Sequence, residues 1–273
     1  MNLSNTSLAK RAMILLFLIL AGFQFESFGQ NMRTVPNIAF APGEKLVFRA
    51  YYNSTLTGNV LAGDAVMEIH PDLQTINGRS AMRVICQMRT RGVFSLFFRV
   101  NNRFESFIDR LAIAPLRFIR NLQEGNYQRN QDVVFDHAGG LAYTNNEVLP
   151  IPAYVQDVLS AFYFARTLPI QNPQPGQEFA MDFFHGDSVF VTRIIYDGTE
   201  RIRTRLGTFN TIRLKPMMHT GETFAQPFPM TLWVTDDMNR VPVRIETGLK
   251  VGNLRLELSE FHGLNNPLAS RVN

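Results

Sequence analysis

The sequence predicts an all-β protein, mainly antiparallel, folded as one strongly curved sheet or incomplete barrel. Three observations predict this fold class: apolar and polar residues alternate with a period of two along most of the chain, turn motifs separate the alternating runs, and only one segment has helical spacing. We expect about a dozen strands, paired antiparallel because the links between them are short. The 273 residues are 45% hydrophobic and 18% charged, which excludes a disordered chain and is enough for a packed core.

Residues 1–29 have the order of a secretory signal peptide. Lys10 and Arg11 precede the apolar run 12–23, and small residues stand at the cleavage positions before Gln30. The run has only about a dozen residues, whereas a membrane-spanning helix needs roughly twenty, so we expect cleavage rather than an uncleaved anchor. A lipoprotein would need a cysteine directly after its signal, where Gln30 stands. The mature protein is therefore predicted to be periplasmic or otherwise exported, not a lipoprotein, and without a transmembrane span.

Residues 30–273 are predicted to form a single β domain with long strands that each bury one face. In residues 93–109 and again in 250–261, apolar side chains share one parity and polar side chains the other. The only cysteine, Cys86, has the apolar parity of the run 82–89. We expect Cys86 in the core rather than in a redox or nucleophilic role, which would need an exposed, electropositive setting.

One segment departs from the two-residue period. Residues 154–168 place apolar side chains at helical spacing, with Asp157 in the expected first turn. The proline-rich stretch 169–175 ends this predicted helix. We expect the helix to bridge two halves of the domain, about 41–149 and 174–262, or to plug the sheet.

The two predicted halves share turn residues in the same order. Pro42 and Pro175 each precede a glycine that opens a strand, and Asp109 and Asp236 each stand six residues before another proline. Ordered matches of this kind favour an internal duplication. The alternative is that unrelated β proteins also reuse glycine and proline at turns.

A set of short motifs, specific in their order and spacing, extends over nearly the whole predicted mature chain. They are Gly43-Glu44-Lys45-Leu46, Ala62-Gly63-Asp64-Ala65, Val134-Phe135-Asp136, Asp157-Val158-Leu159-Ser160-Ala161-Phe162-Tyr163, Gly207-Thr208-Phe209-Asn210-Thr211, Trp233-Val234-Thr235-Asp236-Asp237 and Arg240-Val241-Pro242-Val243. With these motifs the chain resembles the exported domain-of-unknown-function family 3108 (DUF3108). The resemblance implies an envelope-located antiparallel β protein without an assigned biochemical role, similar in shape to curved half-barrel lipoprotein carriers. It supplies no catalytic or ligand-binding residues.

Residues with catalytic chemistry are scattered. The five histidines stand singly, without the spacing of a zinc site. His185 lies near Asp182 and Asp187, which leaves a metal or general-base role open, but a solvated turn accounts for these residues without a second ligand set. No nucleophile elbow, phosphate-binding loop or paired-carboxylate motif occurs. We expect no enzyme activity, no catalytic residues, no metal and no cofactor, and the lack of a Lys/Arg-rich run argues against nucleic acid.

The predicted hairpin around Gly207 concentrates positive charge. Five cations are candidates for an anion-binding site: Arg201, Arg203, Arg205, Arg213 and Lys215. A three-residue loop, 207–209, would set Arg203 opposite Arg213 and Arg201 opposite Lys215. Like charges so placed cost up to about 1 kcal/mol, so an anion should compensate them. A carboxylate on a neighbouring strand is one source, and an anionic ligand such as lipid phosphate or acidic glycan is the other.

Several aromatic residues lie in predicted strands, namely Phe97-Phe98, Phe183-Phe184 and Trp233. Adjacent strand residues point to opposite faces, so one ring of each pair lies off the main core. That second face either lines a ligand cavity in a curved sheet or is covered by the predicted helix. We favour the helix, because a lone helix must bury its apolar stripe somewhere.

These observations favour a monomeric, exported cell-envelope protein with a non-enzymatic binding or structural role. A periplasmic carrier of a hydrophobic or lipid ligand is the alternative, and it would need an open apolar cavity. A hydrolase-like enzyme is the third reading, and it would need residues such as His185 and Asp187 to converge in a cleft. The expected partners are lipid, glycan or another envelope protein.

Overall fold

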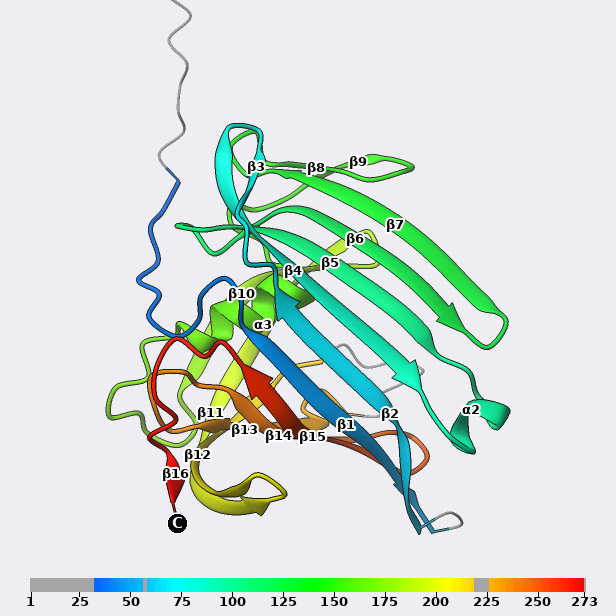
Figure 1. Cartoon of the computed structure of the whole chain (residues 1–273). Coiled ribbons are helices and arrows are strands. Elements are labelled where there is room, and N and C mark those ends of the chain that lie inside the picture. Colours follow the sequence, from blue (N-terminus) through cyan, green and yellow to red (C-terminus); the bar gives the residue numbers. More distant parts are fainter. Residues whose placement is uncertain (1–31, 56–57, 219–225, 273) are drawn as a thin grey trace, which may run out of the picture. The chain divides into compact units, whose positions relative to one another are not determined.

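The computed structural model describes residues 32–55, 58–218 and 226–272, and the chain from Arg33 onward forms one compact unit. The predicted signal peptide, 1–29, lies outside the described residues. The compact unit contains a 16-stranded sheet, shown in Figure 1, in which all neighbouring strands are antiparallel. The sheet is not closed, which confirms the predicted fold class.

The strands divide between the two predicted halves. The first half contains β1 (Lys45–Ser54), β2 (Gly58–Ile69), β3 (Gln74–Ile76), β4 (Arg79–Thr90), β5 (Asn101–Asp109), β6 (Pro115–Glu124), β7 (Tyr127–Asp136), β8 (Leu141–Tyr143) and β9 (Val148–Pro150). The second half contains β10 (Glu178–His185), β11 (Ser188–Thr204), β12 (Gly207–Pro216), β13 (Met230–Thr235), β14 (Pro242–Gly248) and β15 (Asn253–His262), and β16 (Arg271–Val272) lies beyond its predicted end at 262. Two helices, α2 (Phe94–Phe97) and α3 (Val158–Arg166), complete the described elements. Four strands, β3, β8, β9 and β16, have only two or three residues, and the other twelve agree with the number expected.

The order of the strands keeps each half together. It runs β10-β11-β12-β13-β14-β15-β1-β2-β4-β5-β6-β7-β8-β9, with β3 on β4 and β16 on β12. The halves therefore meet where β1 pairs with β15, and α3 belongs to the connection between the two ends of this order. This arrangement is compatible with a duplication, which stays a prediction.

Alternation along the strands separates a core face from an outer face. In β4, Met82, Val84 and Cys86 are buried, whereas the residues between them are half-buried. Cys86 belongs to the main core cluster, and burial raises the pKa of its thiol to about 12. This burial confirms the prediction of a core cysteine. A thiol this hard to ionise is also a poor nucleophile.

Helix α3 begins later than predicted because Asp157 caps it. The Asp157 carboxylate accepts hydrogen bonds from the backbone N–H groups of Leu159 and Ser160, and the Ser160 hydroxyl oxygen accepts a hydrogen bond from the Asp157 backbone N–H at 2.8 Å, which completes a capping box. Tyr154, three residues before Asp157, has a φ of 64°, so it is not helical. Leu159 and Tyr163 are buried in the main core cluster, whose other members come from both halves. The helix thus packs on the core face of the sheet, whereas the sequence favoured a helix on the opposite, second face.

The predicted strand 93–109 is wrong in its first part. Residues 94–97 form α2, and β5 begins only at Asn101. The cause is the pairing of Arg89 with Asn101, which leaves the residues between them to reverse the chain. Gly92, with a φ of 58°, begins this reversal.

Candidate binding groove

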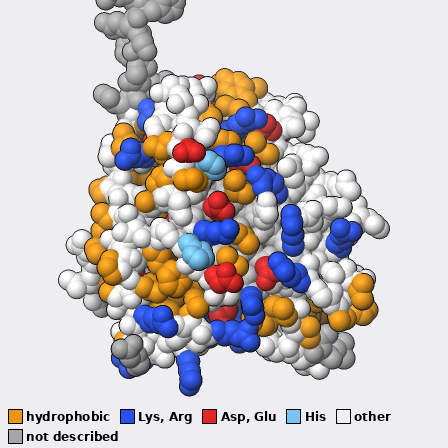
Figure 2. Space-filling model, viewed as in Figure 1, with side chains coloured by type: hydrophobic (Ala, Val, Ile, Leu, Met, Phe, Trp, Pro, Cys, Tyr) orange, Lys and Arg blue, Asp and Glu red, His pale blue; other side chains and the backbone are white. Residues whose placement is uncertain are grey.

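A groove of about 500 Å³ lies on the outer face of β4, β5, β6 and β7. Arg103 lines it, whereas the next residue, Phe104, packs against the core. The register forms one polar row across the four strands, because Gln87 pairs with Arg103, Arg103 with Asn121 and Asn121 with Asn130. In Figure 2, separate blue side chains, which are arginines in these strands, lie among white surface.

A second row runs parallel to the first. Arg89 pairs with Asn101, and Gln123 pairs with Gln128. The rows give the groove its composition: seven carboxamides, two arginines and one apolar residue, namely Gln87, Asn101, Asn102, Asn121, Gln123, Gln128, Asn130, Arg89, Arg103 and Leu122. Carboxamides both donate and accept hydrogen bonds, and arginines only donate. The lining therefore offers many hydrogen bonds and a positive charge, without a carboxylate.

Some of these side chains are held in place by their neighbours. Arg89 Nε donates to Asn101 Oδ1 at 3.0 Å, and Asn101 Nδ2 approaches Gln123 Oε1 at 3.5 Å. Asn102 Nδ2 donates to Glu124 Oε1 at 2.6 Å, while Asn102 Oδ1 accepts from the Gln123 backbone N–H at 3.0 Å. One end of the groove is thus fixed by side-chain hydrogen bonds.

Arg103 is fixed by the buried carboxylate of Glu105. Glu105 accepts from Arg103 Nη2 at 2.9 Å and from Arg83 Nε at 2.6 Å. Burial opposes ionisation of this carboxyl, but the hydrogen bonds from Arg83 and Arg103 outweigh it and hold the pKa of Glu105 below its usual value. Glu105 therefore stays charged and orients the Arg103 guanidinium at the groove.

Other carboxamides in the groove keep their hydrogen-bonding capacity for solvent. Among the residues described, the side chains of Asn121, Gln128 and Asn130 are exposed and make no hydrogen bond within the protein. An arrangement of free carboxamides beside oriented arginines suits a ligand that carries both hydroxyl groups and negative charge.

The predicted hairpin of cations forms with a different register. Thr204 pairs with Gly207, so the turn is Arg205-Leu206 rather than a three-residue loop. Arg203 pairs with Thr208 and Arg201 with Asn210, and the predicted pairs Arg203–Arg213 and Arg201–Lys215 are wrong. The reason is that the turn lies at Arg205-Leu206, before Gly207, rather than at 207–209, and sequence parity does not show where the turn lies.

Carboxylates from the same hairpin compensate part of this charge. Asp197 Oδ2 lies 3.2 Å from Arg213 Nη2 and 3.0 Å from Lys215 Nζ, and Glu200 Oε2 lies 3.4 Å from Arg213 Nη1. Arg201 Nε donates to Asn210 Oδ1 at 3.1 Å. The structure therefore gathers Arg213 and Lys215 around one carboxylate.

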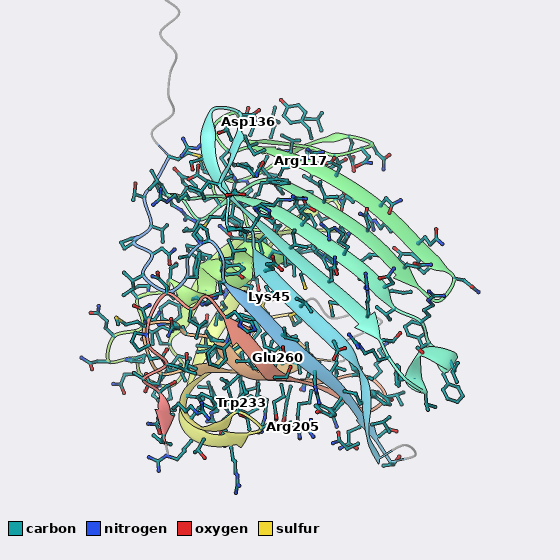
Figure 3. The ribbon with its side chains drawn as sticks, viewed as in Figure 1. Lys45, Arg117, Asp136, Arg205, Trp233 and Glu260 are labelled. Carbon is teal, nitrogen blue, oxygen red and sulfur yellow. The ribbon has the colours of Figure 1, made fainter. Side chains whose placement is uncertain are left out.

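The remaining two cations lie near the turn. Arg205, labelled in Figure 3, donates to the Tyr51 hydroxyl at 3.2 Å, and Arg203 is exposed. An anion site made of all five residues receives no support from these pairings and stays a prediction.

A second hollow, of about 330 Å³, lies beside Trp233, which Figure 3 also labels. Trp233 lies in β13 as predicted, and its Nε1 donates to Glu200 Oε2 at 2.9 Å. Two charged residues of the lining, Glu246 and Arg255, already pair with each other at 2.8 Å. The first groove has the larger volume of the two.

Asp187, in the turn between β10 and β11, joins the two halves. Gly186 and Asp187 both have positive φ, which gives the tight hairpin turn between β10 and β11. The Asp187 carboxylate accepts hydrogen bonds from Arg129 Nη2 at 2.8 Å and from the Gln131 side chain, both in β7. Within the described ranges, no cluster of three or more His, Cys, Asp and Glu side chains has the arrangement of a metal site.

The phenylalanine pairs have different environments. Phe184 is buried and packs edge-to-face on Phe135 at 5.4 Å, whereas Phe183 stacks near the His185 ring at 6.1 Å. Phe97 and Phe98 lie in or directly after α2, not in a strand, and both are exposed. The second faces of these pairs therefore do not share one cavity.

Neither the groove nor the buried Arg120 is evident from the sequence alone. Arg120, in β6, is 5% exposed, and its Nε and Nη2 have no hydrogen-bond partner. Desolvation and the nearby charge of Arg129 lower the pKa of Arg120. The polar parity of β4 to β7 was the available signal for the groove, but parity alone does not show which rows face one another.

Comparison with known proteins agrees with the fold. The family DUF3108, described as a protein of unknown function, matches residues 47–259. No curated protein matches the sequence significantly. Among the described residues, no helix has the length and apolar character needed to cross a membrane.

Three solved structures match this chain at low sequence identity. A β-barrel-like protein of family DUF1849 from Brucella abortus has 10% identity and a TM-score of 0.55, with 85% of this chain and 98% of that chain covered. A proposed lipoprotein from Parabacteroides distasonis has 11% identity and a TM-score of 0.36, covering 85% and 100%. A proposed exported protein with a YmcC-like fold from Bacteroides fragilis has 13% identity and a TM-score of 0.35, covering 85% and 99%. At these identities the first likeness concerns the fold alone.

Proposed function

Because the chain belongs to the DUF3108 family, whose description assigns no activity, we propose a function from the geometry of the chain itself. The protein is a non-enzymatic binding protein of the cell envelope that holds an acidic glycan in the outer groove of β4–β7. The observation that carries this proposal is the lining of seven carboxamides and two arginines without a carboxylate. The envelope location rests on the predicted signal peptide, 1–29.

The chemistry of a glycan matches this lining. Sugar hydroxyl groups donate and accept, as carboxamides do, and an acidic sugar supplies the negative charge that Arg89 and Arg103 can bind. The volume of about 500 Å³ is within the range of small-ligand sites. Because the lining has no aromatic ring for stacking, we expect modest affinity, with a Kd of roughly micromolar to millimolar.

A binding role fits the groove better than catalysis. Its lining contains no histidine, cysteine, serine or carboxylate that would act as a nucleophile or general base. The alternative of a hydrophobic-ligand carrier is less well supported, because α3 packs Leu159 and Tyr163 into the core that such a ligand would occupy.

Calorimetric titration of residues 30–273 tests the proposal. The probes are an oligogalacturonate, which is acidic, a neutral maltooligosaccharide of equal length, and inorganic phosphate. We expect the oligogalacturonate to bind more tightly than the neutral chain. The double variant Asn121→Ala/Asn130→Ala should weaken binding about tenfold, since it removes two hydrogen-bonding groups worth roughly 0.5–1.5 kcal/mol each.

Matched variants outside the groove provide the control. Gln174→Ala/Gln177→Ala removes two exposed carboxamides before β10 and should leave binding unchanged. Arg89→Gln should weaken binding of the acidic probe more than binding of the neutral probe. Arg110→Gln, just after the other end of β5, should weaken binding of neither probe. If phosphate competes fully, or if no oligosaccharide binds, the groove is not a glycan site.

A further inference from the structure

The connection between β4 and β5 places four large apolar side chains in solvent. The exposed fractions are 65% for Val93, 82% for Leu96, 84% for Phe97 and 47% for Phe98. We call these four residues the α2 tip. Phe97 has the largest exposed fraction among the large apolar side chains described, and a contiguous apolar group of this kind marks an interaction site.

The tip is an ordered turn. Ser95 donates from its backbone N–H and its hydroxyl to the Gly92 carbonyl, at 3.2 and 2.7 Å, and Phe98 N–H donates to the Phe94 carbonyl at 3.0 Å. The Phe94 ring points inward and packs on Tyr52 with ring centroids 5.7 Å apart. The Phe94 ring is therefore half-buried against Tyr52, whereas the other large apolar side chains of the segment are exposed.

A neighbouring turn extends the apolar surface. The Tyr52 hydroxyl donates to the Val251 carbonyl at 3.0 Å, so the β14–β15 turn lies beside the same tyrosine as α2. Val251 is 71% exposed. Figure 1 shows α2 projecting beyond the ends of β4 and β5, at the end of the sheet where the β1–β2 hairpin also turns.

Positive charge surrounds this surface. Residues 89–100 include three arginines and no acidic residue. Arg91 pairs with Asp64, whereas Arg99 is exposed and makes no ion pair among the residues described. Lys250, next to Val251, is also exposed. Cations beside exposed aliphatic and aromatic side chains match the two layers of an anionic lipid surface, the headgroups and the acyl chains.

We propose that the α2 tip docks the protein on an anionic membrane surface. Leu96 and Phe97 enter the boundary between headgroups and acyl chains, and Arg99 and Lys250 contact the lipid phosphates. A second copy of the chain fits this surface less well, because a stable protein interface buries about 800 Å² on each partner and a projecting turn with four large side chains offers much less flat area. This inference does not depend on the proposed glycan site.

Vesicle flotation of residues 30–273 tests the proposal without the predicted signal peptide. These residues contain all four described core clusters, so the compact unit is retained. The probes are vesicles of phosphatidylglycerol and phosphatidylcholine in equal parts, and vesicles of phosphatidylcholine alone. We expect binding to the anionic vesicles that weakens with added salt, and much less binding to the neutral ones.

Two variants separate the apolar and charged contributions. Leu96→Ser/Phe97→Ser should weaken partitioning at least tenfold, because burial of even one such side chain changes it by roughly that factor. Arg99→Gln should weaken binding to anionic vesicles about fivefold and leave binding to neutral vesicles unchanged. The matched controls are Val148→Ser/Val191→Ser, which removes two exposed valines elsewhere, and Arg110→Gln; both should bind like the parent.

Three results would overturn the proposal. The first is a parent protein that does not float with anionic vesicles. The second is equal binding by the parent and Leu96→Ser/Phe97→Ser. The third, measured by light scattering without vesicles, is a dimer that this double variant dissociates, which would make the tip an interface between copies of the chain.

Discussion

Glu44 and Arg166 form a two-point ion pair inside the hydrophobic core. Arg166 Nη1 and Nη2 lie 2.5 and 2.7 Å from Glu44 Oε1 and Oε2, and the two side chains are 2% exposed or less. Arg166 also donates to the carbonyl groups of Asn239 and Ala39. Since Glu44 directly precedes β1 and Arg166 ends α3, this pair ties the helix to the centre of the sheet.

Removing one partner of this pair should destabilise the fold strongly. Glu44→Gln leaves the Arg166 guanidinium buried without its counter-charge, and we expect the free energy of unfolding to fall by about 3–5 kcal/mol. Urea denaturation of residues 30–273 measures it. Lys45→Gln is the control, because Lys45 makes only a long, exposed pair with Glu68 at 3.6 Å and should cost less than about 1 kcal/mol. Equal losses for the two variants would contradict the structural role of the pair.

Asp157 should make stability depend on pH. Burial raises the pKa of this helix-capping carboxyl to about 6, although hydrogen bonds from Ser106 and the α3 backbone oppose the shift. The unfolded-state pKa is about 3.9, so the folded protein binds the proton more tightly and its contribution to stability is lost as pH rises from about 4 through about 6. Relative to Asp157→Asn, which does not titrate, the parent should lose up to about 3 kcal/mol between pH 4 and pH 7.

Denaturation of both proteins at a series of pH values checks this expectation. If the stability of the parent relative to Asp157→Asn stays constant or rises with pH, the pKa of Asp157 is not raised. Ser106→Ala sharpens the test, because it removes the 2.6 Å hydrogen bond that stabilises the charged form. In that variant the decline should extend to higher pH than in the parent.

The sequence was enough to predict the sheet because alternation is a local property of each strand. The buried parity of β4, with Cys86, was predictable in this way, whereas Asp157, expected in the first turn of the helix, is its N-cap. The start of β5 was not predictable in this way, because the residues of α2 continue the same apolar alternation. The pairing of Arg89 with Asn101 nevertheless requires the chain to reverse between them. Local pattern cannot show where pairing stops.

The candidate groove depends on register, which sequence parity leaves open. Gln87, Arg103, Asn121 and Asn130 become one row only through three strand pairings. The same limitation explains the wrong pairing predicted for Arg203, where a turn at Arg205-Leu206, earlier and shorter than the predicted loop 207–209, changes every opposed pair.

The unpartnered guanidinium of Arg120 should make the protein less stable than a variant without it. A buried cation without hydrogen bonds costs several kcal/mol of desolvation, whereas Met at this position would fill similar space without charge. We expect Arg120→Met to raise the free energy of unfolding by about 1 kcal/mol or more. Arg129→Met is the matched control in β7: it breaks the 2.8 Å pair with Asp187 and should lower stability. Urea denaturation distinguishes the two signs, and a loss of stability in Arg120→Met would mean that the guanidinium is compensated in solution.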